Sequence, residues 1–438
     1  MISLPDTPHL KVLFQKYMDI HLIGNQHLTD VLFHSFLGVV APIKAYYAGH
    51  TMVPRTHFFP IQNSGTGKSQ AGEALFWLLW FLLPHDKVFK CVKTTDAALI
   101  GSPDADYKKE AKQSRLLFKK EFIYWDEGSV LLKDVPFSED LRDIMQMALD
   151  ESRWIQKALK DGIVQGYTNA TIVAGSYIES KIKYNVLRTG FFQRFIVTFK
   201  EYTDKEKLEI AENLERLEDP TLFTKKMQLQ NEIKAELIKN YGFRYPVDIK
   251  ERKVINFSHE ASRKFTKEFM NYYKTNILGQ YMDSRQDVLE TVWSRVRQHT
   301  VKIAMHNAFL YHRDTLTEED YDYAFDLVER CHIQGMKGLL DSISDEKVAY
   351  KKIDRASQKE FLTDCIAELC QKHNGAVTQT AILDYIARLK KQSKKSSQRP
   401  NFGRNRAWEW IKEMEKDGEI EVVKKEGHTN YIKLVAKK

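Results

Sequence analysis

Short apolar runs alternate with amphipathic stretches along the first half of the chain. Five runs between residues 51 and 200 combine β-branched, aromatic and other apolar residues, as buried strands do. They are THFFPI, KVFKCVK, EFIYWDE, ATIVAGS and RFIVTF. The segments between them have helical periodicity. Strands that alternate with helices predict an α/β fold, with a mostly parallel sheet in a three-layer domain.

The remaining residues have mainly helical patterns. Near the N-terminus, the stretch LTDVLFHSFLGVVAPIKAYY is expected to be helical, and residues 257–345 carry a helical period without strand signals. Changes in composition divide the chain into segments 1–50, 51–200, 201–345, 346–360 and 361–438. We expect these to be, in order, a helical N-terminal segment, an α/β core, a charged helical region, a polar linker and a small C-terminal domain.

Composition narrows the class of protein. A length of 438 residues favours about two to four domains, and the net charge of +8 is a mild excess whose distribution matters more than its total. Four scattered cysteines indicate neither a disulfide framework nor a zinc site. No signal peptide is evident, and the apolar run at residues 74–83 is about half of the roughly 20 residues that a membrane span needs. We expect no membrane association and a cytoplasmic location, in a prokaryote or in the host cell of a virus.

The stretch QNSGTGKSQ lies between the first predicted strand and a strongly apolar helical stretch. It matches the second half of the phosphate-binding loop Gly-x-x-x-x-Gly-Lys-Ser/Thr, in the strand–loop–helix setting that this motif requires. Lys68 is expected to reach the β- and γ-phosphates of ATP, and the Ser69 hydroxyl to bind Mg²⁺. Gln62 replaces the first glycine of the motif. The predicted nucleotide-binding residues of the loop are Ser64, Gly65, Thr66, Gly67, Lys68 and Ser69.

A second motif supports the first. The run FIYWDE has the form of a Walker B strand, which ends in two acids. Asp126 is expected to hold Mg²⁺, directly or through water, and Glu127 to polarise the attacking water as general base. Either motif alone is weak, but the two in this order predict an ATP-hydrolysing P-loop domain.

The sequence after these acids resembles AAA+ ATPases of the MCM clade. RWIQKALKDGIVQGYTNATIVAGSY reads as a β-hairpin that leads into a further strand, and LysAspGlyIle in it is similar to the Lys-Ala-Gly-Ile of that clade. The resemblance implies that Lys160, or failing that Lys157, contacts nucleic acid in a central channel. An insertion before the Walker B strand also faces the channel in this family, which makes Lys108, Lys109 and Lys112 further candidates; a solvated face is the other interpretation.

The same resemblance implies further residues of the ATPase site. The strand ATIVAGS would end in the sensor residue, where the family usually has Asn and this chain has Ser176, with Tyr177 as the other candidate. The segment GFFQRFIV resembles one that carries the arginine finger, which implies that Arg194 acts on the ATP of a neighbouring subunit, with Arg188 as the fallback.

A helical stretch farther along the chain is similar to the MCM lid. In SRVRQHTVKIAMHNAFLYHRDTLTEEDYDYAFDLV, the segment 317–320 is a helix start with Thr317 as N-cap and acids in the first turn. Counting back from Asp320 assigns Arg295 as sensor 2, near the γ-phosphate in cis or in trans, with Arg297 as a near alternative; Lys302 takes the place of another family arginine.

The C-terminal segment predicts three helices and a two-stranded hairpin, with breaks at Gly375 and Gly418 and a turn at Gly427. This order is typical of a winged helix. Between residues 388 and 406 there are eight basic residues and no acid, which suits contact with phosphates. A protein-binding winged helix and a solvated basic linker are the other interpretations. The predicted nucleic-acid contacts in this segment are Lys394, Lys395, Arg404 and Arg406.

Together these patterns predict an AAA+ core, a helical lid and a C-terminal winged helix. The resemblance implies a reduced MCM-like helicase of a mobile element or virus, because residues 1–50 leave no room for the large N-terminal region of the family. It would bind ATP, Mg²⁺ and DNA, and act as a homo-oligomer, in most such cases a hexameric ring. Two other functions stay open: a DNA-bound replication initiator that does not unwind, and a motor that remodels proteins.

Overall fold

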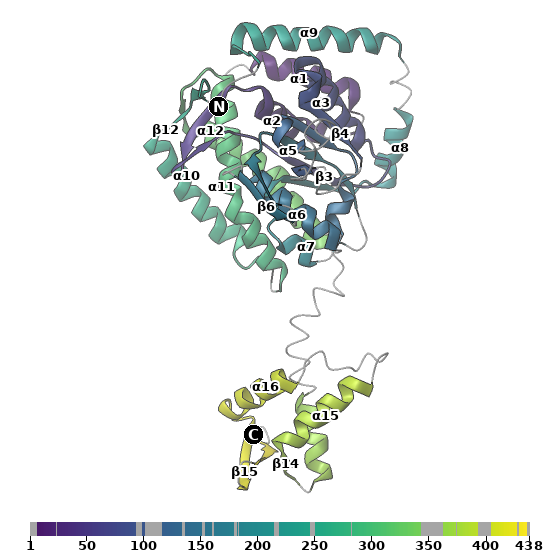
Figure 1. Ribbon diagram of the computed structural model, residues 1–438, viewed down its shortest axis with the longest axis vertical. Coiled ribbons are helices and arrows are strands. Elements are labelled where there is room, and N and C mark those ends of the chain that lie inside the picture. The colour runs from purple at the N-terminus through teal and green to yellow at the C-terminus, as the bar shows by residue number, and fades with distance from the viewer. Residues whose placement is uncertain are drawn as a thin grey trace. The chain divides into compact units, whose positions relative to one another are not determined.

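The structure is a computed structural model, and the chain divides into two compact units, residues Met1–Ile343 and Ser344–Lys438 (Figure 1). Each unit is described by itself. The residues that the structure describes are 7–22, 24–92, 99–100, 116–133, 136–150, 154–159, 162–178, 182, 184–213, 219–245, 250–281, 283–342, 362–373, 375–392, 404–426 and 429–435.

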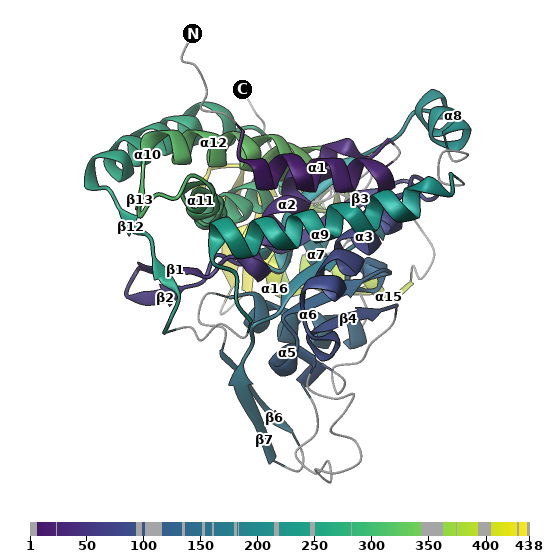
Figure 2. The same ribbon diagram turned by 90° about the horizontal axis from the view of Figure 1, so that it is seen from above.

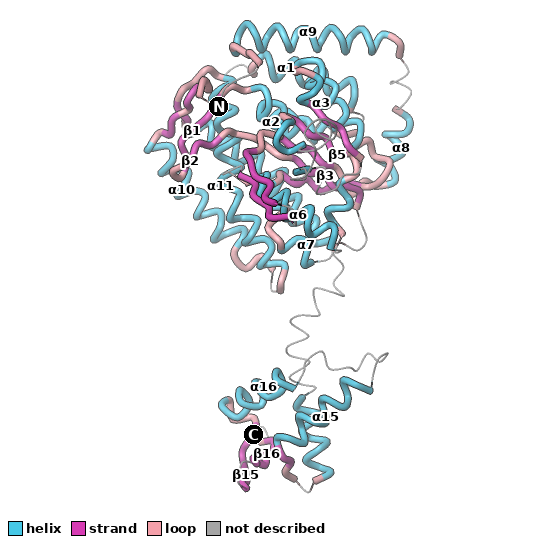
Figure 3. The backbone as a smooth tube through the Cα atoms, in the orientation of Figure 1, coloured by secondary structure: helices cyan, strands magenta, loops and turns pink. Residues whose placement is uncertain are grey.

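A parallel sheet lies at the centre of the first unit, as Figure 3 shows in magenta. Its described strands lie in the order β10-β3-β8-β5-β4, and β9 continues beside β3. All of these pairs are parallel. The three middle strands are buried along their whole length, which is why they read as unbroken apolar runs. The bounds are β3 (Phe58–Gln62), β4 (Val88–Cys91), β5 (Phe122–Trp125), β8 (Thr171–Ala174), β9 (Ser176–Tyr177) and β10 (Ile196–Lys200). The predicted α/β fold with a mostly parallel sheet is confirmed.

Helices cover the sheet. In Figure 2, α1 and α9 lie side by side next to α3, and the three pack on one another. α11 packs against α2 and α12, and α13 against β10. The helices of this unit are α1 (His9–His21), α2 (Thr29–Val40), α3 (Lys68–Leu82), α5 (Leu116–Lys119), α6 (Pro136–Leu149), α7 (Tyr184–Arg188), α8 (Asp204–Glu212), α9 (Thr221–Tyr241), α10 (His259–Tyr272), α11 (Arg285–Leu310), α12 (Glu318–Val328) and α13 (Gln334–Ser342). Short 3-10 or π turns complete them, among them η3 (Gly128–Leu132), η4 (Phe192–Arg194) and η7 (Glu329–Ile333).

Two expectations about the helical regions were wrong. The helix near the N-terminus ends at Val40, and residues Ile43–Tyr47 form a strand, β1. Pro42 follows the helix end and disfavours helical geometry in the residue before it. In the region expected to lack strands, Thr315–Leu316 form a short strand. The other short strands of the first unit are β2 (His50–Met52), β11 (Lys253–Val254) and β12 (Asn256–Phe257), and the strand at Thr315–Leu316 is β13.

A two-stranded antiparallel hairpin, β6 (Trp154–Leu159) and β7 (Gly162–Tyr167), projects from the first unit (Figure 2). It lies at the predicted position, between the acids of β5 and the strand β8. Ile155 and Val164 are buried on its inner face, while Trp154 and Tyr167 are exposed and form an edge-to-face ring pair on the other.

The second unit contains a helix over residues 362–372, then α15 (Gln379–Gln392) and α16 (Arg404–Lys416). The predicted hairpin is present as β15 (Ile420–Glu426) and β16 (Thr429–Leu434). A short strand, β14 (Val377–Thr378), adds to β16 between the first two helices. Buried apolar side chains of the helices and strands form one core, which includes Trp410 of α16 and Ile432 of β16.

Candidate phosphate-binding site

The loop between β3 and α3 has the backbone form of an anion cradle. Gly65 and Gly67 have φ values of +75° and +81°, which glycine adopts without strain. A Cβ atom on Gly67 would lie 2.9 Å from Asn25 Nδ2. In the described part of the chain, no backbone carbonyl accepts a hydrogen bond from the N–H groups of residues 64, 65 and 67. Because these donors lie at the N-terminus of α3, they are available to an anion.

Gln62, which replaces the motif's first glycine, supports the loop from inside. Its side chain is 1% exposed, and its Nε2 donates to Thr66 Oγ1 and to Asn25 Oδ1, each at 2.9 Å. The Thr66 hydroxyl in turn donates to the carbonyl of Asn63 at 2.7 Å. A glycine at this position could make neither side-chain bond. The departure from the motif is therefore a different way of fixing the same loop.

Two residues that the sequence did not single out hold the loop from outside. Asn25, between α1 and α2, is buried and donates through Nδ2 to the carbonyl of Thr66. Tyr202, just after β10, donates from its hydroxyl to Asn25 Oδ1 at 2.8 Å and from its backbone N–H to Asn63 Oδ1. No sequence motif marks either residue, since each acts through a contact between segments far apart in the chain.

Lys68 lies close to the acids at the end of β5. Burial lowers the pKa of Lys68, and the charges of Asp126 and Glu127 oppose that shift. Asp126 is half-buried and Glu127 is exposed. The Tyr124 hydroxyl donates to Asp126 Oδ1 at 2.7 Å, which orients this carboxylate. A lysine and a serine hydroxyl at the start of α3, with two carboxylates just after β5, suit a magnesium-bound polyphosphate, since hard oxygen ligands are those that Mg²⁺ prefers.

The tyrosine that orients Asp126 is itself fixed by α3. Its ring occupies the space that a side chain at Gly72 would fill, since a Cβ there would lie 2.2 Å from Tyr124 Cε2. Burial, with the neighbouring Asp126, raises the pKa of Tyr124 far above its ordinary value, so it stays a neutral donor. The helix that begins at Lys68 thus also positions the carboxylate.

The strand β8 lies between the strands that carry the loop and the acids, and β9 continues from it beside β3. Gly175, between β8 and β9, accepts a hydrogen bond from the Gly128 N–H at 2.7 Å, and Lys68 Cδ lies 3.8 Å from the place of a Cβ on Gly175. Ser176 follows, 1% exposed, and its hydroxyl donates to the carbonyl of Tyr177 at 3.0 Å. Tyr177 is half-exposed. Both sensor candidates therefore follow the strand that lies between the loop and the acids.

The two arginines expected to act on nucleotide lie together. Arg194, at the end of η4, forms an ion pair with Asp150 at 3.0 Å, and Arg295 of α11 approaches the same carboxylate at 3.4 Å. Asp150 follows α6 and was not singled out by the sequence. The alternatives lie elsewhere: Arg297 donates to Thr266 Oγ1 at 2.9 Å, and Arg188 is exposed at the end of α7. Figure 1 shows α7 and α11 in the first unit.

Several candidate nucleic-acid contacts lie outside the described residues. They are Lys160, between β6 and β7 in the sequence, the insertion lysines Lys108, Lys109 and Lys112, and Lys394 and Lys395. Lys157 is half-buried in β6 and its pairing partner is Val164, which puts it on the inner face of the hairpin. Arg404 and Arg406 lie in the first turn of α16. Helix α11 holds Lys302 in the core, 5% exposed, where it does not face solvent.

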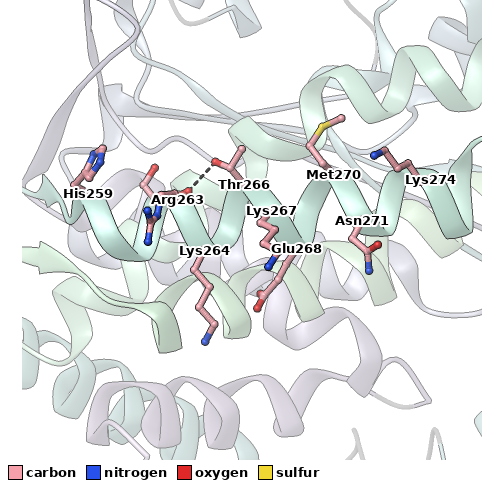
Figure 4. A pocket seen from close by; sticks show the side chains of 10 residues that line it. His259, Arg263, Lys264, Thr266, Lys267, Glu268, Met270, Asn271 and Lys274 are labelled. Atoms are coloured by element: carbon pink, nitrogen blue, oxygen red, sulfur yellow. Dashed lines mark hydrogen bonds between the residues drawn. The ribbon is translucent and has the colours of Figure 1, made fainter.

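An open hollow lies along the exposed face of α10 (Figure 4). Its lining includes Arg263 and Lys267, and Lys264, which pairs with Glu318. Every described residue that lines it belongs to α10 or to Lys274 just beyond that helix. The hollow is thus separate from the phosphate loop.

We compared the chain with protein-family models and with curated proteins. No protein-family model matches the chain, and no curated protein matches it. Among the described residues, none of the helices combines the length and the apolar character that crossing a bilayer demands.

Proposed function

We propose that this protein is an ATP-dependent DNA helicase or translocase of the MCM-like AAA+ type that works as an oligomeric ring. The observation that carries the proposal is the convergence at one sheet edge of the glycine loop, Lys68 and the acids Asp126 and Glu127. The strand order adds support, because β8 separates the two motif strands and brings the sensor candidate between them.

In this proposal each group of the site has a distinct task. Backbone N–H groups of the loop and Lys68 bind the phosphates, and Ser69 with Asp126 holds the Mg²⁺ ion. Glu127, exposed at the rim, takes the proton of the attacking water. Bound Mg²⁺-ATP supplies the phosphoanhydride bond whose hydrolysis drives movement.

The arginine pair supports assembly. Arg194 lies on η4 and Arg295 on α11, and both are held by Asp150 rather than by Asp126 or Glu127 of their own site. An arginine that serves catalysis from there would act on nucleotide held by another copy. A ring is the closed arrangement in which each copy completes its neighbour's site.

Contact with DNA is proposed at two places. The β6–β7 hairpin would carry Lys160 into a channel, where it grips one strand by its phosphates. In the second unit, three helices and the β15–β16 hairpin have the order of a winged helix, with Arg404 and Arg406 at the start of α16. No base-reading residue is assigned.

The test is strand displacement on forked DNA, run beside ATP hydrolysis and nucleotide binding. We expect Lys68→Ala to lose ATP binding, hydrolysis and unwinding, because the loop loses the cation that reaches the phosphates. We expect Lys160→Ala to keep ATP binding but lose unwinding. A matched control is Lys225→Ala, since Lys225 lies on α9 with only an exposed pairing to Asp219; it should behave as the wild type.

Each contrary result points to a different error. Full hydrolysis by Lys68→Ala would refute the nucleotide site. Hydrolysis per chain that is independent of protein concentration would refute the shared site. Tight duplex binding without unwinding by the wild type would favour the replication initiator, and normal unwinding by Lys160→Ala would refute the channel assignment.

A further inference from the structure

Two arginine side chains from separate elements meet at one carboxylate oxygen, which belongs to Asp150. Arg194 Nη2 lies 3.0 Å and Arg295 Nη2 3.4 Å from the same atom, Asp150 Oδ2. Arg194 also donates through Nη1 to the carbonyl of Gly190 at 2.7 Å, and Arg295 through Nη1 to Gln298 Oε1 at 2.8 Å. Each guanidinium is thus held at two points, and Asp150 is the point they share.

A hydrogen bond also joins the two segments that bear these arginines. His299 lies one turn after Arg295 on α11, and its Nε2 lies 2.7 Å from the carbonyl oxygen of Gln193, the residue before Arg194. Because a carbonyl oxygen only accepts, this nitrogen carries the proton. Burial lowers the pKa of His299 well below its ordinary value, so the ring stays neutral at physiological pH. The turn that bears Arg194 and the helix that bears Arg295 are therefore coupled.

Among the described residues, the ion pairs at this place join two cations to one anion. Both guanidinium groups contact the carboxylate of Asp150, and all three side chains reach solvent, with exposed fractions of 15% for Arg194, 25% for Arg295 and 31% for Asp150. Two guanidinium groups around one oxygen atom form a fork that also suits a phosphate oxygen.

We propose that Asp150 is a positioning residue for the shared ATPase site: it holds Arg194 and Arg295 side by side, so that they meet the phosphates of a neighbouring copy as one preformed fork. The proposal rests on the function proposed above and adds Asp150 to it. The carboxylate occupies the place between the guanidinium groups in the isolated chain, and a phosphate oxygen replaces it on assembly. Without it, two long cationic side chains would repel each other and separate.

The experiment measures steady-state hydrolysis by Asp150→Ala, Asp150→Asn and Asp150→Glu in the full chain, at a protein concentration where the wild type is fully active. Loss of the orientation of a catalytic group costs about 10- to 100-fold in rate, so we expect kcat to fall by that factor in the Ala and Asn variants. KM for ATP should stay within about twofold, because Lys68 and the loop of the same chain are untouched. Asp150→Glu, which restores the charge, should regain part of the loss. If Asp150→Ala does not fold, the isosteric Asp150→Asn carries the test.

Two further variants separate the possible failures. In an Arg194→Ala background, Asp150→Asn should lower kcat no further, since it acts through that arginine. Asp326→Ala removes an acid that pairs with Arg330 on the exposed side of α12, at 2.9 Å, and should leave kcat unchanged.

Normal kcat in Asp150→Asn, together with a large loss in Arg194→Ala, would overturn the role of Asp150 alone. Full activity of Arg194→Ala would overturn both this role and the shared site proposed above. Equal losses in Asp150→Glu and Asp150→Ala would show a merely structural residue and overturn it too.

Discussion

At the phosphate loop, the backbone of single residues decides whether an anion can be held. Gly67 has φ +81°, a backbone conformation that favours glycine, and a side chain there would contact Asn25. Both its conformation and its lack of a side chain therefore matter for the loop. Gly49 has the same φ value, but a Cβ there would meet nothing within 4 Å. A comparison of substitutions at these two glycines therefore distinguishes the effect of backbone strain from that of steric contact.

We expect Gly67→Ala to abolish nucleotide binding and Gly49→Ala to preserve it. Each variant places alanine in left-handed geometry, which costs about 1–2 kcal/mol of the free energy of unfolding. Only Gly67→Ala also pushes on Asn25 Nδ2, 2.9 Å from the new Cβ, and so displaces the loop. Urea unfolding should show similar losses in both variants, and fluorescent-nucleotide titration should separate them. Equal nucleotide affinity in the two variants would contradict the cradle.

At the scale of elements, the buried strands were predictable because each is an unbroken apolar run between turn signals. β3, β5 and β8 follow that pattern residue by residue. Short strands such as β12 and β13 were missed, because two residues carry no period. The order of strands, and the meeting of Asp150 with Arg194, depend on contacts across the chain that no local pattern records. Lys68 and Asp126 could be proposed from the sequence because their motifs are local.

The start of α12 shows a local signal that was correct. Thr317 is the N-cap, as predicted, and it forms a capping box with Asp320. Asp320 is fully buried and also accepts a hydrogen bond from Asn307 at 2.8 Å. α8 has a capping box of the same design at Thr203, but the side chain of its partner Glu206 is 38% exposed.

We expect Thr317→Ala to lower the free energy of global unfolding by about 1–2 kcal/mol, at the upper end of N-cap losses. Thr203→Ala should lower it by less than about 0.5 kcal/mol, because α8 buries only Ile210 and can fray without global unfolding. Urea unfolding followed by circular dichroism checks both values. A larger loss in Thr203→Ala would show that α8 is part of the cooperative core.

For the whole molecule, burial keeps several histidines as neutral rings. Burial lowers the pKa of His34 and of His332 to about 3, and that of His21 to about 4. His57 and His306 shift in the same direction for the same reason. The rings have defined tasks: His332 Nδ1 accepts the Val197 N–H at 3.1 Å and so joins η7 to β10.

These shifts predict that the fold loses stability in mild acid. The unfolded chain binds protons to histidine below a pH of about 6.5, whereas the folded chain does not until its lowered pKa values are reached. Stability is therefore complete above about pH 6.5 and falls as pH decreases from there. Each such histidine contributes up to about 1.4 kcal/mol per pH unit.

The check is the urea midpoint of unfolding between pH 7 and pH 5. His332→Asn can keep an acceptor for the Val197 N–H and should reduce the slope by about one proton. The pKa of Glu206 is lowered to about 2, mainly because it accepts a hydrogen bond from the Thr203 backbone N–H. Its protonation therefore lowers stability only below about pH 4.5, outside this pH window. A midpoint that is constant from pH 7 to pH 5 would contradict the burial of neutral rings.

The hydrogen bond from Asn25 to the Thr66 carbonyl limits how far this protein can be shortened from its N-terminus. A chain trimmed to begin at residue 51 would keep every residue of the two motifs. It would lose the Asn25 side-chain amide, which donates a hydrogen bond to the Thr66 carbonyl. Such a fragment would expose the hydrophobic faces that α1 and α2 cover, and Gln62 would keep only its partner within the loop. The smallest piece of this protein that keeps the loop in this form therefore begins well upstream of the loop, before α1.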